Sequence, residues 1–210
     1  MIQTALNKVE QAMADVRQGR MVIIQDDQSR ENEGDLVCAA EMVTGEHINF
    51  MARNGCGLIC TPMLGERLTY LELPQMVNKN EESHQTAFTV SVDALEGVTT
   101  GISAYERATT IRRLIDADAK ATDFVRPGHV FPLRAKQNGV LERRGQTEAS
   151  IDLMRLAGLY PAAVICEIMK EDGHMAREQE LIAFSHQYGI NMITVDDVAT
   201  YRRENGYLAF

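Results

Sequence analysis

No stretch of this 210-residue sequence is long and apolar enough to cross a bilayer. The N-terminus, MIQTALNKVEQAM, also lacks the basic flank and continuous apolar core of a signal peptide. Positive charge is scarce, because 21 lysines and arginines stand against 30 acidic residues, for a net charge of −9. Binding to a phosphate backbone requires a basic face, so nucleic acid is not expected as a partner. These absences predict a cytoplasmic protein that binds neither membrane nor nucleic acid.

Cysteine is also sparse, and the sequence lacks the common nucleotide-binding motifs. The four cysteines, Cys38, Cys56, Cys60 and Cys166, lie in or beside apolar, strand-like segments. Their spacing matches neither a paired zinc knuckle nor a secreted disulfide framework, so most are expected to be small buried core residues. Neither a Walker loop nor a GxGxxG motif is present, and a nucleotide cofactor is therefore not expected.

Helical and strand-like patterns alternate along the chain. Apolar residues recur at helical spacing up to Gly19, and further helices are expected at 44–52, 64–73, 104–116, 179–188 and 196–203, with another that begins within 143–147. Strands are expected at 21–24, 36–40, 57–61, 87–92, 162–169 and 190–195. This alternation predicts an α/β fold, a single-domain three-layer α/β/α sandwich over residues 1–210. Because 87–92 and 129–135 fit the pattern less well, the sheet is expected to be mixed.

Five carboxylates gather within ten residues, directly after the first predicted strand. The stretch from 22 to 35 reads VIIQDDQSRENEGD, and its acidic residues are Asp26, Asp27, Glu31, Glu33 and Asp35. A generic charge run is most often a solvated acidic turn. Here a second apolar run follows at once, so a tight turn between two buried strands would hold the carboxylates together. Carboxylates fixed in this way favour a hard divalent cation, and we interpret the stretch as a metal site.

A second candidate site is the Arg-Arg-Gly-Gln-Thr sequence at 143–147, where a helix is expected to begin. A helix N-terminus leaves unpaired N–H groups, and Gly145 allows a ligand to approach them closely. The arginines and Thr147 add further donors, so a phosphate monoester suits such a site. An arginine-rich turn in which Thr147 caps its own helix accounts for the same residues equally well.

Five motifs follow one another along the chain. They are SRENEGD at 29–35, GVTTGISAYERATTIR at 97–112, RPGHVFPLRA at 126–135, GQTEASIDLMRLAGL at 145–159, and the ICEIM, EDG and MAR pieces of 165–177. Together they resemble the 3,4-dihydroxy-2-butanone 4-phosphate synthase family of riboflavin biosynthesis. The similarity covers essentially the whole chain, and the length resembles the stand-alone form rather than a fusion with GTP cyclohydrolase II.

The resemblance implies an activity and a set of partners. It implies a lyase that converts D-ribulose 5-phosphate into L-3,4-dihydroxybutan-2-one 4-phosphate and formate, with Mg²⁺ or Mn²⁺ as cofactor. It also implies a homodimer whose active sites lie near the subunit interface. Enolisation, dehydration, rearrangement and loss of one carbon all require proton transfer and a cation that stabilises enediolate charge.

The resemblance also assigns roles within the acidic stretch. Arg30 and Glu31 match the residues that bind the substrate and the metal. Glu33 matches a residue that supports the metal through a water molecule. Asp35 matches a residue that binds a substrate hydroxyl group.

Further matches lie elsewhere in the chain. His129 and Glu167 match positions that the family requires for catalysis, and Glu167 also matches a substrate contact. Asp26 and Cys60 match further catalytic positions, although Cys60 would equally serve as a core residue. Thr100 matches a substrate-binding position. The remaining histidines are expected to be structural or surface residues.

The phosphate-binding segment of the family corresponds to Arg143, Gly145, Gln146 and Thr147, with one departure. Where the family has GHTEA, this sequence has GQTEA, so Gln146 replaces the second protein ligand of the metal. An amide oxygen is a hard ligand suited to Mg²⁺, but it cannot offer the imidazole nitrogen that favours softer cations.

Three functions remain open at the level of the sequence. The first, which we favour, is the active synthase. The second is a catalytically impaired relative that binds sugar phosphate, disabled by Gln146. The third is another metal-dependent sugar-phosphate enzyme, such as an isomerase or aldolase. The presence of Glu31, His129 and Glu167 favours the synthase over the impaired relative, and formate release separates it from the third function.

Overall fold

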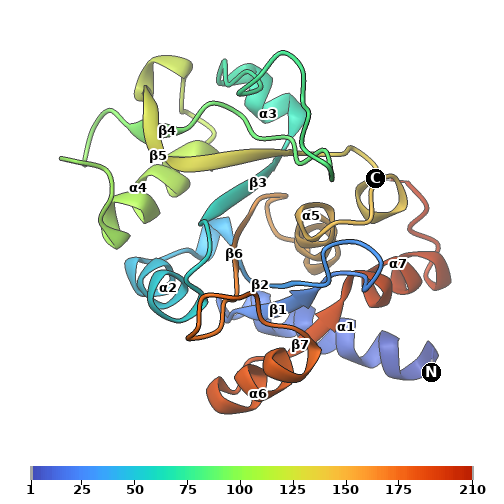
Figure 1. The fold of residues 1–210 in the computed structure, drawn as a ribbon. Coiled ribbons are helices and arrows are strands. Elements are labelled where there is room, and N and C mark those ends of the chain that lie inside the picture. The colour runs from blue at the N-terminus through green and yellow to red at the C-terminus, as the bar shows by residue number, and fades with distance from the viewer. Residues whose placement is uncertain (1, 210) are drawn as a thin grey trace.

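The structure, a computed structural model, describes residues 2–209 (Figure 1). Its strands form a sheet of the order β4-β5-β3-β6-β2-β1-β7. The strands are β1 (Val22–Gln25), β2 (Gly34–Ala39), β3 (Cys60–Leu64), β4 (Val92–Ala94), β5 (Phe124–Ala135), β6 (Ala163–Glu167) and β7 (Met192–Thr194). The α-helices are α1 (Ile2–Arg17), α2 (Gly45–Phe50), α3 (Gly65–Tyr70), α4 (Ala104–Ile115), α5 (Gln146–Ala157), α6 (Glu178–Tyr188) and α7 (Val195–Glu204).

Apolar side chains cover both faces of this sheet, because successive strand residues point to opposite sides. In β1, Val22 and Ile24 pack into a core with α1, α5 and α7, whereas Ile23 packs into a second core with α2, α3, α4 and α6. All three side chains are fully buried. Parallel and antiparallel pairs occur in the same sheet. The predicted three-layer α/β/α sandwich with a mixed sheet is therefore confirmed.

The acidic stretch forms the connection of a β-hairpin. β1 and β2 pair antiparallel with Gln25 opposite Gly34, and the Asp26 N–H donates to the Glu33 carbonyl at 2.8 Å. β2 also pairs with β6, and β1 also pairs with β7. The expected connection between two buried strands is confirmed, but it is the loop of residues 26–33 rather than a tight turn. We refer to residues 26–33 as the acidic loop.

The strand predicted at 57–61 begins later than expected and continues through a proline. It is β3, and Pro62 falls between Cys60, which pairs with Ile165 of β6, and Met63, which bridges to Ala162 just before β6. Proline has no backbone N–H, so it is tolerated in a strand only where the ladder needs no donor at that position. The helix predicted at 64–73 is the shorter α3.

The strand predicted at 87–92 is wrong. Phe88 and Thr89 form only isolated bridges, and the strand in this region is β4 at 92–94. The hydrogen-bond partners explain the difference. The N–H groups of Thr89 and Val90 donate to the carbonyls of Pro132 and Pro74, and a proline has no N–H group with which to extend a ladder. Alternation of apolar and polar residues predicts a strand, but the backbone groups that face the segment determine whether a ladder of hydrogen bonds forms.

None of the helices in residues 2–209 has both the length and the apolar character needed to span a membrane.

Candidate active site

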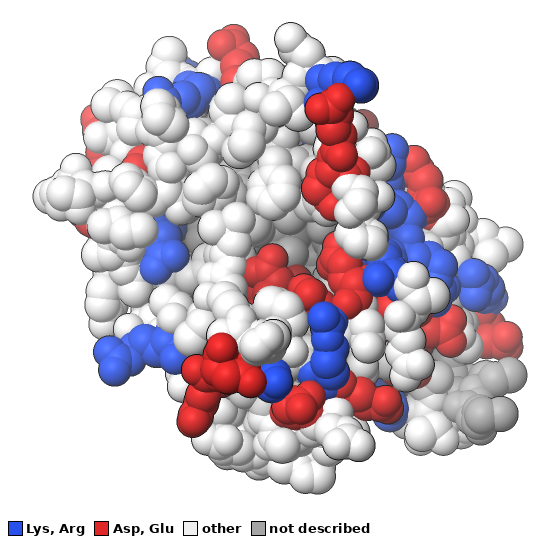
Figure 2. Space-filling model, viewed as in Figure 1, with Lys and Arg blue, Asp and Glu red and all other residues white. Residues whose placement is uncertain are grey.

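Most of the predicted site residues gather around one cavity of about 350 Å³. Those that line it are Arg30, Glu31, Glu33, Asp35, Cys60, Gln146, Thr147 and Glu167. They come from the acidic loop, β2, β3, β6 and the start of α5. Strand pairing brings them together, since β6 lies between β2 and β3. Figure 2 shows acidic and basic side chains around a hollow near the middle of the visible face.

Arg30 connects the acidic loop to α5. Its Nη1 donates to Asp26 Oδ2 at 2.6 Å and to Gln146 Oε1 at 2.8 Å, while Nη2 lies 2.8 Å from Glu31 Oε1. Burial opposes the charge of Arg30, but the carboxylates of Asp26 and Glu31 outweigh burial and raise its pKa. A single guanidinium therefore holds an oxygen of Glu31 and an oxygen of Gln146 next to each other.

Two buried carboxylates of the site have an oxygen without a hydrogen-bond partner among residues 2–209. These atoms are Asp26 Oδ1 and Asp35 Oδ1. Burial, followed by the charges of Glu167 and Glu31, raises the pKa of Asp35 well above its usual range. Burial also raises the pKa of Glu167, which faces Asp35 across the β2–β6 pair. Crowded carboxylates with unused acceptor atoms are suited to a cation or to the hydroxyl groups of a ligand.

The donor atoms present fit a hard divalent cation. Glu31 and Glu33 offer carboxylate oxygens and Gln146 offers an amide oxygen, all at the same cavity. In the described part of the chain, no group of three or more His, Cys, Asp or Glu residues is placed to hold an ion. An ion bound here would therefore depend on Glu31, Gln146, water and ligand oxygens. Magnesium, which usually keeps several waters, suits that arrangement.

The start of α5 has the features of an anion site. Gly145 is the N-cap of α5, and no side chain caps this helix. Thr147 does not cap its own helix, so the alternative interpretation of 143–147 as a self-capped turn is wrong. Instead Thr147 lines the cavity, at the helix end where N–H groups lack intrahelical partners.

Arg143 has a different set of contacts from the one expected. Its Nη1 pairs with the buried Glu148 at 2.6 Å, and its Nη2 donates to the His84 carbonyl at 3.0 Å and to Thr86 Oγ1 at 3.2 Å. Arg143 thus ties α5 to a loop whose residues Glu82, His84, Thr86 and Phe88 also line the cavity. The polar stretch 78–85 is expected from the sequence to be a loop, but nothing in the sequence indicates that it reaches the cavity, and His84 is a lining residue rather than a remote surface residue.

Two other arginines fix the acidic loop from outside. Arg177 Nη1 donates to the carbonyl oxygens of Glu31 and Asn32 at 2.6 and 2.7 Å. Arg144 holds Asp27 through two hydrogen bonds of 2.8 and 3.1 Å. The contribution of Arg177 was missed in the sequence, because these partners are separated by more than a hundred positions and no local pattern connects them.

Cys60 is almost fully buried although it lines the cavity. Burial, with the nearby charges of Glu167 and Asp35, raises the pKa of its thiol well above the usual range. The sulfur is therefore held as a neutral thiol rather than as the thiolate that a nucleophile requires.

His129 and Thr100 do not line this cavity. His129 lies on β5, where its Nδ1 is 2.7 Å from Asp93 Oδ2. Thr100 lies in the exposed loop before α4, beside Gly101, which packs against Asp93. Asp26 and Arg143 bond to lining residues, and Gly145 directly precedes the lining residue Gln146. The structure therefore divides the predicted residues into a large group at the cavity and a small group around Asp93.

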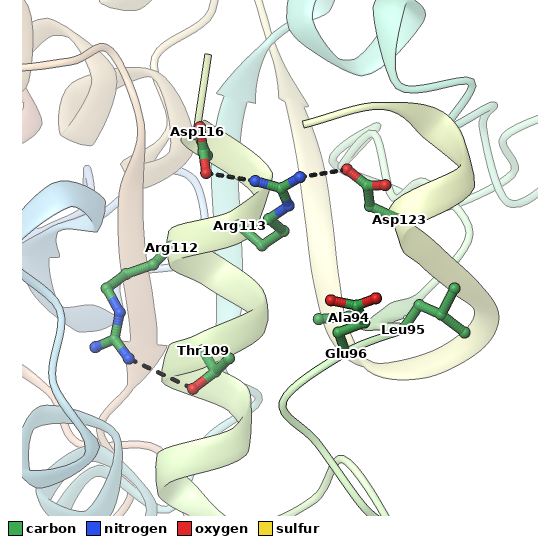
Figure 3. Close-up of a pocket in the computed structure, with 8 residues that line it drawn as sticks. All are labelled: Ala94, Leu95, Glu96, Thr109, Arg112, Arg113, Asp116 and Asp123. Carbon is green, nitrogen blue, oxygen red and sulfur yellow. Dashed lines mark hydrogen bonds and ion pairs between the residues drawn. The ribbon is translucent and has the colours of Figure 1, made fainter. Parts of the chain in front are cut away.

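A larger cavity, of about 510 Å³, lies between α4 and β4 (Figure 3). It is lined by none of the predicted site residues. Arg113 there pairs with Asp116 at 2.5 Å and with Asp123 at 2.6 Å, so both of these carboxylates already have a cationic partner. None of the buried side-chain atoms that lack a hydrogen-bond partner in residues 2–209 belongs to a residue that lines this cavity.

The fold and the cavity define an α/β protein with an acidic, cation-suited site beside an uncapped helix start. The profile of the 3,4-dihydroxy-2-butanone 4-phosphate synthase family matches residues 10–201. The chain belongs to this family, and the predicted resemblance is confirmed.

Individual relatives agree with this assignment. The riboflavin biosynthesis protein RibBA of Aquifex aeolicus is 59% identical over 93% of this chain, and that of Nocardia farcinica is 53% identical over 96%. Each match covers 49% of the relative, so the chain spans about half the length of the curated relatives it matches.

Solved structures of the family have the same fold. A 3,4-dihydroxy-2-butanone 4-phosphate synthase in complex with two magnesium ions is 45% identical, with a TM-score of 0.88 over 94% of this chain and 98% of that one. The two-domain RibBX of A. baumannii is 52% identical, with a TM-score of 0.89 over 92% of this chain and 57% of that one.

Proposed function

We propose that the protein is a lyase that converts D-ribulose 5-phosphate into L-3,4-dihydroxybutan-2-one 4-phosphate and formate in riboflavin biosynthesis. The two products together contain all the atoms of the substrate. The observation that carries the proposal is the position of Gln146 and Thr147 at the uncapped start of α5, next to Glu31. This arrangement offers a phosphate site and a cation site within one small cavity, and the family of the chain supports it.

The residues of the cavity have separate roles in this reaction. Glu31 and Gln146, with Glu33 acting through water, would hold Mg²⁺, which would supply positive charge where negative charge develops on substrate oxygens. Glu167 holds a proton more readily than an ordinary carboxyl group because burial raises its pKa, and this suits general acid and base steps. Its Oε2 accepts the Leu58 N–H at 2.8 Å, which fixes the orientation of the carboxyl group. Asp35, opposite Glu167, binds a substrate hydroxyl.

The direct test is incubation with D-ribulose 5-phosphate and Mg²⁺, followed by measurement of formate. We expect formate and a four-carbon ketose phosphate in equal amounts, loss of both with a chelator, and recovery with excess Mg²⁺. Formate distinguishes the synthase from an isomerase or aldolase, which release none. A folded protein that makes no formate at any concentration of Mg²⁺ or Mn²⁺ would contradict the proposal.

We also propose that the protein is a homodimer in which His129 and Thr100 complete the cavity of the partner subunit. Two observations support this. His129 does not line the cavity of its own chain. In addition, large apolar side chains are exposed on β5, in the loop between β4 and α4, and at the start of α4, namely Val125, Leu95, Ile102 and Tyr105. Exposed apolar groups gathered in one region are typical of an interface.

Mixing two inactive variants tests this shared site. Glu31→Gln disables the cavity, and His129→Ala disables the group that the partner contributes. If both variants exchange subunits, each mixed dimer regains one intact site, and we expect about a quarter of the wild-type activity for a shared site. A mixture that stays inactive although mixed dimers form would contradict it.

Gln146→His restores the family residue and changes the expected metal preference. Histidine should tighten the binding of Mn²⁺, on the order of tenfold, more than that of Mg²⁺, because imidazole nitrogen suits the softer cation better than an amide oxygen. Titration calorimetry with each metal measures this, and Gln137→His, at an exposed position outside the cavity, is the control. Equal Mn²⁺ affinity in both proteins would mean that position 146 does not bind the metal.

A further inference from the structure

We propose that Asp93 is a positioning residue that fixes the tautomer and the ring orientation of His129, so that Nε2 is presented as the proton acceptor. This inference rests on the proposed function, and it adds that His129, which matches a position required for catalysis, transfers a proton. Asp93 lies on β4.

One carboxylate holds both the backbone and the ring of His129. Asp93 Oδ1 accepts the backbone N–H of His129 at 2.8 Å, and Oδ2 lies 2.7 Å from Nδ1. Both oxygens of the carboxylate are therefore used on the same residue. The side chain has two fixed points, and the ring direction is set by the β4–β5 pair rather than by its own rotamer preference.

The burial of the two partners is unequal in a way that suits proton transfer. The Asp93 side chain is 8% exposed, whereas that of His129 is 43% exposed. An ionised carboxylate only accepts hydrogen bonds, so Nδ1 must carry the proton. The lone pair of the neutral ring then lies on Nε2. When Nε2 accepts a proton from substrate, the imidazolium formed is stabilised by Asp93, which itself stays ionised.

The surrounding backbone is shaped around this carboxylate. A side chain at Gly101 would collide with the Asp93 carboxylate, and one at Gly128 would collide with the Val92–Asp93 backbone. Gly101 has a φ of +81°, which other residues rarely adopt. The β4–β5 register also shifts between Val92 and Asp93, and such irregularities commonly redirect a side chain. Two chain segments thus approach Asp93 closely, and one of them carries Thr100.

A simpler interpretation of the Asp93–His129 ion pair is that Asp93 only stabilises the pairing of β4 with β5. The two roles predict different results for Asp93→Asn, which keeps the size of the side chain but allows its amide to donate to Nδ1. A purely structural role predicts lower stability with an unchanged tautomer. A positioning role predicts that the proton moves to Nε2 and that kcat falls with little change in KM.

Nitrogen-15 NMR of the full chain with labelled histidine, recorded without metal or substrate, reads the tautomer directly. We expect the Nδ1–H form of His129 in the wild-type protein and the Nε2–H form in Asp93→Asn. With ribulose 5-phosphate and Mg²⁺, we expect kcat of the variant to fall by a factor on the order of 10²–10⁴, as for the equivalent change in a catalytic Asp–His pair. Asp123→Asn, which alters a carboxylate paired with Arg113, is the matched control and should change neither result.

Each part of the proposal has an outcome that overturns it. If His129 of the wild-type protein carries its proton on Nε2, the proposal is wrong. This measurement needs no variant, so it decides the question even if Asp93→Asn fails to fold. A changed tautomer with wild-type kcat would show that the orientation of His129 does not matter for the reaction. The tautomer is measured without turnover. Absence of formate from the wild-type protein would therefore reject the proposed function, whereas the effect of Asp93 on the tautomer would still be tested by NMR.

Discussion

Glu31→Gln will reduce kcat by a factor of about 10³ or more, because a cation in the site loses its charged ligand and stabilisation worth several kcal/mol. Glutamine has nearly the same shape as glutamate, so the acidic loop should keep its backbone. That backbone is held independently by Arg177, which bonds to the carbonyl groups of residues 31 and 32 rather than to the Glu31 carboxylate. Formate release under saturating substrate and Mg²⁺ measures the effect.

The control for this change is Glu10→Gln, at an exposed position on α1. It alters the net charge by the same amount but lies outside the cavity, and it should leave turnover unchanged. Circular dichroism and thermal unfolding should show that both variants are folded. Turnover of Glu31→Gln near the wild-type value would exclude Glu31 as a ligand that the reaction requires.

Arg202→Met will lower the free energy of unfolding by about 3–5 kcal/mol, the range found when one partner of a buried ion pair is removed. Arg202 and Asp152 are both fully buried, with 2.7 Å between Nη1 and Oδ2. Arg202 also donates to the carbonyl of Asn138 at 2.7 Å and to that of Tyr207 at 3.0 Å. Methionine fills much of the same space but leaves the Asp152 carboxylate without its cation. Urea unfolding at neutral pH measures the loss.

Two further variants identify the cause of this loss. Arg203→Met changes the exposed neighbour of Arg202 on α7 and should have little effect on stability. The double variant Arg202→Met with Asp152→Asn should recover part of the loss, because no buried charge then remains uncompensated. Equal instability of the single and double variants would show that packing, and not charge, determines the effect.

The fold could be predicted from the sequence where burial alone decides the structure. β6 and the β1–β2 hairpin are short apolar runs that end at polar residues, and both were placed within a few positions. β4 could not be placed, because the 87–92 segment alternates like a strand while its hydrogen-bond partners are set by Pro74 and Pro132. Pairing between distant segments is not encoded in the periodicity of either one.

The candidate site was predictable where its residues share one local segment. The acidic loop brings together Arg30, Glu31, Glu33 and the neighbouring Asp35 because a hairpin leaves them little freedom. The resemblance of motifs supplied roles for His129 and Thr100 but no positions, and the structure places both outside the cavity. The contact of Arg177 with the acidic loop and the lining residues 82–88 depend on tertiary contacts that no motif describes.

The placement of the acidic loop within the sheet has a consequence for ligand entry. Both strands that carry it are interior strands, flanked by β6 on one side and β7 on the other. The loop ends are therefore immobilised by the sheet, and only residues 26–33 can rearrange around a ligand. Little chain entropy remains to be lost on binding, so more of the interaction energy is available for affinity. Preorganisation of this kind predicts rapid entry of ligand without any movement of the helical layers.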